Sequence, residues 1–341
     1  MPQGSILGPL LYLIYVNDFY QCLINSSSVL FADDTTLIIT ASSFERLFKI
    51  ANEDLQNLYT WLCLNQLTIN LTKTKYILYS LTKRTSTCPQ HLNLELNGKL
   101  IKRVENFVFL GITVNENLSW KPHMLSVLSK IQRNLGIVRK IACFLDRSSL
   151  FQLYHSLIMS HIRYGITVWY HSHIDLRKKI QACANKFLRM IFFLDWDDSV
   201  RNLMKEHKLL SVNQIFHLEI SKIMQRVVLQ TIPSPFTRVF ENQYGPSSIY
   251  NRSSSAISRC SARNNKSMQA LRYAGPLAWN AIPLSVKKTP ASNADQILTD
   301  QQVLKYDTLP LKAFVKNMKA HALFNIEFYP SSKTQPKIIW F

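Results

Sequence analysis

The sequence predicts an α+β fold, in which a short region of strands precedes a larger region of helices. Apolar runs flank two adjacent acids near the start of the chain, at Val29–Phe31 and Leu37–Ile39, a spacing typical of a β-hairpin. Further along, apolar residues recur every three or four positions within Ser126–Leu145 and again within Ile180–Ile191, the period of an amphipathic helix. The chain of 341 residues is long enough to bury a hydrophobic core.

The first hairpin carries the most informative side chains, because Asp33 and Asp34 are expected at its tip. Two carboxylates held a few ångströms apart repel each other, and a divalent cation between them removes that cost. Mg²⁺ prefers hard oxygen ligands and is commonly bound by one or two carboxylates together with substrate phosphates. Asp is also common in ordinary turns, so a polar turn without a metal is the alternative interpretation of the pair alone.

Three further motifs accompany the paired acids. Residues 1–9 have the sequence MPQGSILGP, in which Gly4 and Gly8 alone would mark ordinary turns. WLCLNQLTIN begins at Trp61 and leads to Lys73 and Lys75, which alone would indicate a solvated basic turn. FLGI follows at Phe109–Ile112 and alone would indicate a strand and a turn.

In this order and at these spacings, the motifs resemble those of the reverse transcriptases of non-LTR (LINE-type, jockey-like) retrotransposons. The first block is similar to motif B of the polymerase palm, FADD to motif C, the W…LN…KTK block to motif D, and FLGI to the primer-grip motif E. The resemblance covers residues 1–225 well. It is fainter beyond, where Gly275–Pro283 resembles the family's GxxxWNxLP stretch with Ile282 in place of Leu.

The resemblance implies an RNA-directed DNA polymerase fragment that, in the intact parent, adds deoxynucleotides to a primer 3′ end by two-metal phosphoryl transfer. Mg²⁺, or Mn²⁺ in its place, would be the cofactor. Asp33 and Asp34 would be catalytic and bind the metal, and Lys73 would protonate pyrophosphate, with Lys75 as a neighbouring alternative. The residues that the resemblance assigns to template, nucleotide or primer are Gln3, Gly4, Phe109, Leu110 and Gly111.

The resemblance also implies a domain layout: a truncated palm with motif E over 1–125, a helical thumb over 126–230 and an irregular basic C-terminal region over 231–341. The family needs another metal-binding aspartate, in motif A upstream of motif B. We expect that residue in a missing N-terminal palm and fingers segment of the parent protein, and we expect this chain alone to be inactive. Asp18 is the only other acid before FADD and is expected to be structural.

Charge is distributed unevenly along the chain. The formal net charge is +19 and the pI about 9.7. Residues 1–82 carry six acids and four bases, a net of −2, whereas residues 83–341 carry a net of +21. This suits a metal site beside a channel for an RNA template, a DNA primer and deoxynucleoside triphosphates, with binding that weakens as salt rises. A basic solubilising surface is the alternative.

The two amphipathic helices carry part of this charge beside their apolar stripes. These bases are Lys130, Arg133, Lys140, Lys178, Lys179, Lys186 and Arg189. The helices would form a thumb that grips the primer–template, or simply present a solvated face. Leu153–Trp169, between them, predicts a buried apolar helix.

Other features of the sequence bear on the location of the protein, on metal and disulfide sites, and on one helix end. The start of the chain has no basic leader and no apolar run approaches about 20 residues, so we expect an intracellular protein of cytoplasm and nucleus that is neither secreted nor membrane-bound. Six cysteines without CxxC spacing argue against a zinc site or a disulfide framework. His171 and His173 lack a third metal ligand nearby, and Asp198 or Ser199 is expected to cap a helix over Val200–Leu210.

Three hypotheses follow for the chain. It is a polymerase fragment that is active only within a longer parent, a non-enzymatic nucleic-acid-binding remnant, or the product of a pseudogene. Because the motif A strand is missing, we expect the palm strand Val29–Phe31 to leave apolar surface exposed unless a missing segment or a partner covers it.

Overall fold

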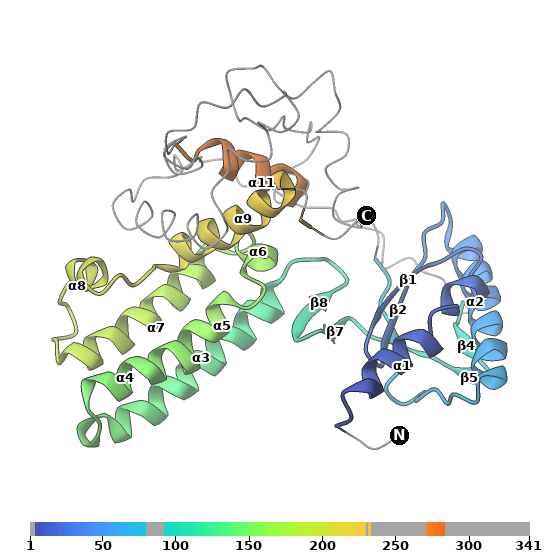
Figure 1. Cartoon of the computed structure of the whole chain (residues 1–341), viewed down its shortest axis with the longest axis horizontal. Helices are drawn as coiled ribbons and strands as arrows, with labels where there is room; N and C mark the ends of the chain where they lie inside the picture. Colours follow the sequence, from blue (N-terminus) through green and yellow to red (C-terminus); the bar gives the residue numbers. More distant parts are fainter. Residues whose placement is uncertain (1–3, 80–91, 230, 233–270, 284–341) are drawn as a thin grey trace. The chain divides into compact units, whose positions relative to one another are not determined.

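The computed structural model describes residues 4–79, 92–229, 231–232 and 271–283, which form two compact units (Figure 1). The N-terminal unit comprises residues up to 107 together with 115–117, and the helical unit comprises 108–114 together with 118 onward. Among the described residues, strands are confined to the region before residue 116, and long helices dominate after residue 120. The predicted α+β class is therefore confirmed; the three domain ranges of the sequence analysis stay predictions.

The N-terminal unit is built around one long helix. Its elements are α1 (Leu7–Tyr15), η1 (Phe19–Cys22), β1 (Ser27–Phe31), β2 (Asp34–Ile38), α2 (Phe44–Leu64), β3 (Lys75–Tyr76), β4 (Glu95–Leu96), β5 (Lys99–Leu100), β6 (Lys102–Arg103), β7 (Asn106–Phe109) and β8 (Ile112–Asn115). The last two strands, β7 and β8, form a hairpin whose residues are divided between this unit and the helical unit. Ser43 caps α2 by accepting the backbone N–H of Arg46 at 3.3 Å. In the last turn of α2, the Trp61 ring meets Phe19 edge-on at 5.3 Å in the core of this unit.

The first hairpin is confirmed, with a shift of one residue at its tip. β1 and β2 pair antiparallel with Phe31 opposite Asp34, so the two-residue loop is Ala32–Asp33 and Asp34 begins the second strand. Ala32 has a positive φ of 52°, which lets so short a loop reverse the chain. Among the described residues, β1 and β2 form a sheet of their own, and so do β3 with β6, β4 with β5, and β7 with β8.

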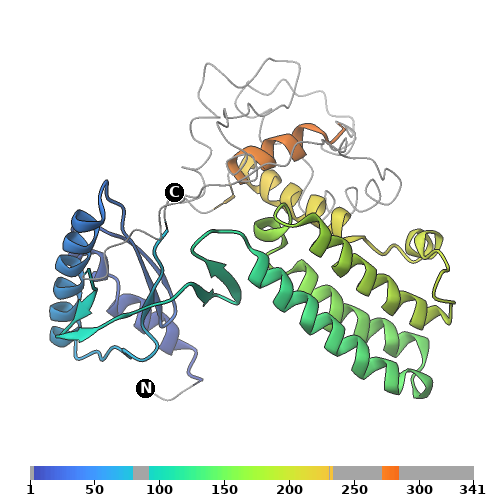
Figure 2. The ribbon, with the colours of Figure 1, turned by 180° about the vertical axis from the view of Figure 1, so that it is seen from behind.

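The helical unit contains α3 and α7 side by side, with α4 and α5 packed along them (Figures 1 and 2). Its helices are α3 (Lys121–Ile141), η3 (Ala142–Phe144), α4 (Arg147–Leu153), the π-helix η4 (Tyr154–Met159), α5 (Ser160–Arg163), α6 (Ile166–Trp169), α7 (Ile174–Phe192), α8 (Arg201–Glu206), α9 (Val212–Val228) and α11 (Leu271–Asn280). Both predicted amphipathic helices are present. Their apolar stripes, including Ile131 and Phe187, are buried in one core.

The expected single helix over Leu153–Trp169 is wrong, although its burial is right. The segment is divided into the end of α4, then η4, α5 and α6, with a break at Tyr164–Gly165. Gly165 has a positive φ of 60°, a conformation that ends α5 and that glycine adopts without strain. Ile158, Ile162 and Trp169 are each 0% exposed, as a buried segment requires.

The helix after residue 199 is shorter than expected and is capped differently. Val200 occupies the N-cap position of α8 and its own side chain makes no cap hydrogen bond, whereas the Ser199 hydroxyl accepts the backbone N–H of Arg201, the first residue of the helix, at 3.4 Å. The Asp198 carboxylate instead accepts the backbone N–H of Asp195 at 2.9 Å and closes the preceding turn. The Arg189 Nε donates to the Asp198 carbonyl at 2.9 Å, which fixes this turn to α7.

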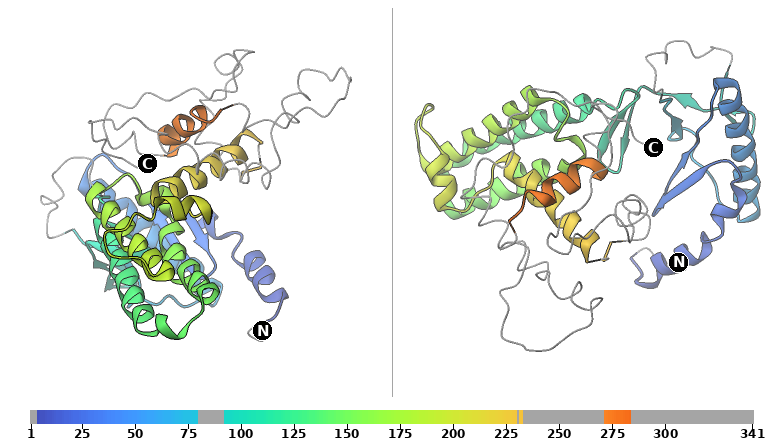
Figure 3. Two further views of the ribbon diagram at one scale, coloured as in Figure 1. Left: turned by 90° about the vertical axis from the view of Figure 1, so that its left-hand side faces the viewer. Right: turned by 90° about the horizontal axis from the view of Figure 1, so that it is seen from above.

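The family-like segment near Gly275 belongs to the core of the helical unit. It forms α11, which packs against α9 (Figure 3), and Trp279 is 1% exposed there. Most of the basic C-terminal region expected over 231–341 lies outside the described residues. None of the described helices combines the length and apolar character needed to cross a membrane.

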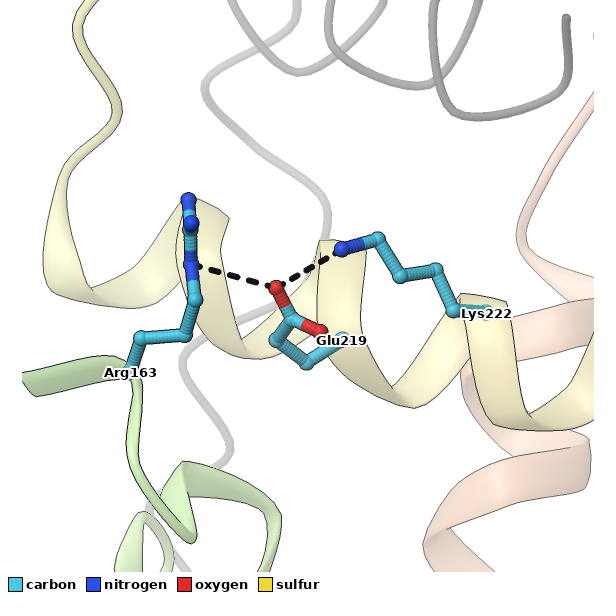
Figure 4. A network of polar contacts seen from close by, with 3 residues as sticks. All are labelled: Arg163, Glu219 and Lys222. Carbon is cyan, nitrogen blue, oxygen red and sulfur yellow. Dashed lines mark hydrogen bonds and ion pairs between the residues drawn. The ribbon is translucent and has the colours of Figure 1, made fainter. Parts of the chain in front are cut away.

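An ion-pair network joins α5 to α9 in the same unit (Figure 4). Glu219 Oε1 lies 3.3 Å from Arg163 Nε and 2.9 Å from Lys222 Nζ. The Glu219 side chain is 20% exposed, so one partly buried carboxylate compensates two cations. The network holds the end of α5, next to the Tyr164–Gly165 break, against α9.

Candidate functional site

The paired carboxylates lie on the solvent side of the first hairpin. Asp33 is the second residue of the loop and Asp34 the first of β2, and both side chains are exposed. Within the described part of the chain, neither carboxylate accepts a hydrogen bond or forms an ion pair. Two neighbouring anions without protein donors are the arrangement that a hard cation stabilises.

A buried acid holds the loop that precedes the hairpin. Asp54, on α2, is 0% exposed and accepts the backbone N–H of Ile24 at 3.1 Å and that of Asn25 at 3.0 Å. Burial raises the pKa of the Asp54 carboxyl, but the nearby Ser26 hydroxyl and the hydrogen bonds from Ile24 and Asn25 outweigh it and hold that pKa below its usual value. The loop that leads into β1 is thereby tied to α2.

The sequence alone did not lead us to identify Asp54 as a positioning residue. The signal was available, because Asp54 interrupts the apolar stripe of α2 between the buried residues Ala51, Leu55 and Leu58. An acid on the buried face of a helix must find hydrogen-bond donors there.

The donor set at the hairpin fits part of a Mg²⁺ site. Asp33 and Asp34 offer two carboxylates, and no group of three or more His, Cys, Asp or Glu that could hold a metal occurs in the described residues. Phosphate oxygens of a nucleotide and water are the ordinary remaining ligands of Mg²⁺. Asp18, by contrast, precedes η1, and its carboxylate caps nothing there.

The motif B and motif D residues lie in the same unit as the hairpin. Gln3 lies outside the described residues. Gly4 is exposed with a positive φ of 86°, just before α1. Lys73 is exposed in a turn in which its backbone N–H donates to Asn70 Oδ1 at 3.2 Å. No hydrogen bond or ion pair among the described residues joins Lys73 to Asp33 or Asp34.

The motif E residues form a second, separate feature in the helical unit. Phe109 ends β7, and Leu110 and Gly111 are the two-residue loop that leads to β8. Both loop residues have positive φ, 44° and 78°. The Tyr164 hydroxyl donates a hydrogen bond to the Leu110 carbonyl oxygen. His123, on α3, supports the next strand, because its Nδ1 accepts the Thr113 N–H at 3.3 Å.

The basic helices present cations without acidic partners. The exposed bases of α3 and α7 include Lys130, Arg133, Lys140, Lys178, Lys179 and Lys186. The three ion pairs found in the described residues involve other side chains. These cations are therefore available to phosphate groups, which is how basic surfaces contact nucleic acid.

His171 does not face an open site. Its ring packs edge-on against Phe216 at 4.8 Å, and its Nε2 atom is buried without a hydrogen-bond partner. Burial, with help from Arg177 and His217, lowers the pKa of His171 to about 4. This is the environment of a core histidine.

Comparisons with known proteins agree with the motifs. Residues 1–114 match the family described as reverse transcriptase (RNA-dependent DNA polymerase). The RNA-directed DNA polymerase from mobile element jockey of Drosophila melanogaster is 24% identical over 67% of this chain and 25% of its own length. The jockey polymerase of Drosophila funebris is 22% identical over 60% of this chain and 23% of its length.

A second group of relatives comes from another element. The Retrovirus-related Pol polyprotein from type-1 retrotransposable element R1 of Bradysia coprophila is 29% identical over 50% of this chain and 17% of its own length. The chain thus spans a quarter or less of the length of these relatives. No solved structure matches the chain significantly. Residues 1–114 match the reverse transcriptase family, and the chain is similar to the RNA-directed DNA polymerase of jockey and to the Pol polyprotein of R1, both from non-LTR retrotransposons.

Proposed function

We propose that this chain is the palm and thumb portion of an RNA-directed DNA polymerase encoded by a non-LTR retrotransposon. Residues 1–125 would be the partial palm with motif E, 126–230 the thumb and 231–341 a basic C-terminal region. One observation carries the proposal: Asp33 and Asp34 are adjacent, exposed carboxylates without a partner among the described residues, at a hairpin tip within the segment that matches the reverse transcriptase family.

Asp33 and Asp34 would hold Mg²⁺, or Mn²⁺ in its place. When bound, the metal neutralises charge on the phosphates and lowers the pKa of the attacking primer hydroxyl. The Asp33–Asp34 pair itself supplies hard oxygen ligands, and Asp54 keeps the strand before the pair in place. Lys73, exposed in its turn, would donate a proton to the leaving pyrophosphate.

The remaining motif residues would position the nucleic acids. Gln3 and Gly4 would contact template and incoming deoxynucleoside triphosphate, since a glycine with positive φ leaves room for a base or sugar. Phe109, Leu110 and Gly111 would contact the DNA primer near its 3′ end. The exposed bases of α3 and α7 would bind the phosphate backbone of the RNA template and primer, with an affinity that falls as salt rises.

A complete two-metal site requires more ligands than Asp33 and Asp34 offer, because both metals must be held in the geometry of the reaction. We therefore propose that a further carboxylate comes from a palm and fingers segment of the parent protein, and that this chain alone binds primer–template without extending it. An enzyme of this kind acts inside the cell, so we propose the cytoplasm and nucleus as its location.

A second candidate function is non-enzymatic binding of nucleic acid by a remnant of such an element. The observation that favours it is the set of exposed cations on α3 and α7 that have no acidic partner in the part of the chain that the structure describes. If the chain is the product of a pseudogene, neither polymerase activity nor nucleic-acid binding is required of it, and its motifs are inherited.

Primer extension and binding, measured together, test the proposal. The chain and its D33A/D34A variant are incubated with poly(rA)/oligo(dT), dTTP and Mg²⁺, and binding is followed as salt rises. We expect salt-sensitive binding by both proteins and no extension by either. Extension that disappears in the variant would show that the chain completes its own site. Weak binding that does not respond to salt would contradict both candidate functions.

A further inference from the structure

The loop at Leu110–Gly111 has an uncommon backbone conformation that neighbouring residues must maintain. Leu110 has a positive φ of 44°, where the Cβ of an L-residue crowds the backbone at a cost of about 1 kcal/mol. Such conformations persist only where the surrounding structure over-determines them. The contacts made to this loop therefore control where its side chains lie.

Tyr164 contacts the loop in two ways. Its hydroxyl donates a hydrogen bond to the carbonyl oxygen of Leu110. Its ring also lies against Gly111, because a Cβ placed on Gly111 would be 3.2 Å from Tyr164 Cε1 and 3.4 Å from its hydroxyl oxygen. The ring thus occupies the space that any side chain at residue 111 would need.

Gly165 brings the same segment against the next residue of the hairpin. A Cβ on Gly165 would lie 2.6 Å from Ile112 Cδ1, closer than real carbon atoms approach. Its φ of 60° also favours glycine. Two consecutive residues, Tyr164 and Gly165, therefore contact three consecutive residues of the hairpin, Leu110 to Ile112.

The backbone of Tyr164 is fixed, whereas its side chain is largely outside the core. Its carbonyl accepts the Trp169 Nε1–H at 3.1 Å, and its N–H donates to the Ser160 carbonyl at 3.1 Å. Trp169 is 0% exposed, whereas Tyr164 is 55% exposed. A residue this exposed contributes little apolar burial, so removing its hydroxyl changes the loop and leaves the core intact.

We propose that Tyr164 is a positioning residue that holds the Leu110–Gly111 loop in the conformation in which it meets the primer strand. That the loop binds the primer rests on the proposed function, whereas the contact between Tyr164 and the loop does not depend on that function. Without the hydroxyl, the Leu110 carbonyl loses its donor and Leu110 relaxes toward negative φ. The orientation of Phe109 and Gly111 changes with it.

Hydrogen exchange tests the hold on the loop without any nucleic acid. In the full chain carrying Tyr164→Phe, amide exchange over residues 106–115 is expected to rise about tenfold, the effect of losing one hydrogen bond. Exchange in α3 and α7 and the melting temperature should stay at the wild-type level. Tyr20→Phe, at another exposed tyrosine (61%), is the matched control. Unchanged exchange over 106–115, or a rise throughout the helical unit, would overturn the proposal.

A probe at the primer terminus tests what the loop does. An RNA template is annealed to a DNA primer that ends in 2-aminopurine, and fluorescence is measured as the chain binds. Tyr164→Phe should lose most of the fluorescence change while total binding stays within about twofold, because the basic helices are unaltered. A full fluorescence change in Tyr164→Phe would overturn the proposal. If the wild-type chain binds without a change in fluorescence, the loop is not a primer grip, and only the exchange result bears on Tyr164.

A second pair of variants tests the contact between this segment and the hairpin independently of Tyr164→Phe. Gly165→Ala should disturb the loop more than Tyr164→Phe does, because the new methyl group meets Ile112 Cδ1. Adding Ile112→Val removes that carbon and should restore part of the slow exchange. An equal exchange rate in Gly165→Ala and in wild type would contradict the close contact on which the proposal depends.

Discussion

Asn25 donates two hydrogen bonds to the Asp54 carboxylate, one from its backbone N–H at 3.0 Å and one from its side-chain amide at 3.4 Å. Asn25 lies two residues before β1, and Asp54 lies on the buried face of α2. One carboxylate therefore fixes the start of the strand that leads to Asp33. This contact makes the position of the candidate metal ligands depend on a residue outside the motifs.

Replacing Asp54 with Asn should destabilise the N-terminal unit by about 2 kcal/mol or more, because an amide N–H₂ group would face buried N–H donors. The free energy of unfolding is obtained from hydrogen exchange in α2. Since the pKa of Asp54 is held below its usual value, its contribution is present above about pH 4 and is lost as the pH falls further. Glu53→Gln, at the exposed neighbouring position, is the control, and equal losses in both variants would contradict this role.

Three histidines of the helical unit should make its stability depend on pH. Burial is the main cause that lowers the pKa of His123, His171 and His217 to about 4, and nearby Lys130 or Arg177 adds to it. An unfolded histidine titrates near pH 6.5, so the unfolded chain binds more protons between about pH 6.5 and 4. The free energy of unfolding therefore decreases as the pH falls through this window.

The variant His171→Gln isolates one of these groups. It should reduce the slope of the unfolding free energy against pH by about a quarter to a third, since one of four histidines with a lowered pKa, three of them at about 4, no longer titrates. Urea unfolding at pH 7, 6, 5 and 4.5 gives the slope, and His173→Gln, a histidine next to the buried group, is the control. A slope in His171→Gln equal to that of the wild type would show that the pKa of His171 is not lowered on folding.

Two glycines of the helical unit should respond in opposite ways to alanine. A Cβ on Gly275 would lie 2.4 Å from Met224 Sδ, where α11 packs on α9, so Gly275→Ala should cost about 1–3 kcal/mol. Gly136, exposed on α3, has nothing within 4 Å of the same position, so Gly136→Ala should gain about 0.5–1 kcal/mol. Urea unfolding measures both. Changes of the same sign would argue against the close packing of α11.

Helix α1 should cause the isolated chain to self-associate. Four of its apolar side chains are more than half exposed: Leu7 at 61%, Leu10 at 54%, Leu13 at 59% and Ile14 at 65%. Contiguous apolar surface of this kind favours association in water. Light scattering at rising concentration should show association that a Leu13→Gln, Ile14→Lys variant reduces. Leu125→Gln with Ile137→Lys, at isolated exposed positions of α3, should not reduce it. A wild-type monomer at all concentrations would refute the expectation.

Sequence periodicity was sufficient where an element buries one face. The three- and four-residue spacing of apolar residues located α3 and α7, because their exposed faces are charged and the contrast is clear. It failed over Leu153–Trp169, where most residues are apolar and show no such contrast. The break at Tyr164–Gly165 depends on contacts with a hairpin more than 50 residues earlier, and a local pattern does not contain them.

The candidate site was predicted in part for the same reason. Adjacent acids between two apolar runs placed Asp33 and Asp34 at a hairpin tip, within one residue of where they lie. Short-range spacing could not show that both carboxylates lack protein donors or that Asp54 holds the preceding loop. It also could not show that Leu110 needs Tyr164, because these contacts join residues distant in sequence.

The most direct test of the central claim, that Asp33 and Asp34 bind the metal that serves nucleotide transfer, is cleavage by hydroxyl radicals generated at bound Fe²⁺. The chain is loaded with primer–template, dTTP and Fe²⁺ in place of Mg²⁺, and both polypeptide and primer are analysed for breaks. We predict cleavage of the chain around residues 31–36 and of the primer at its 3′ end, with both absent in the D33A/D34A variant. The same pattern of breaks in the variant would contradict the claim.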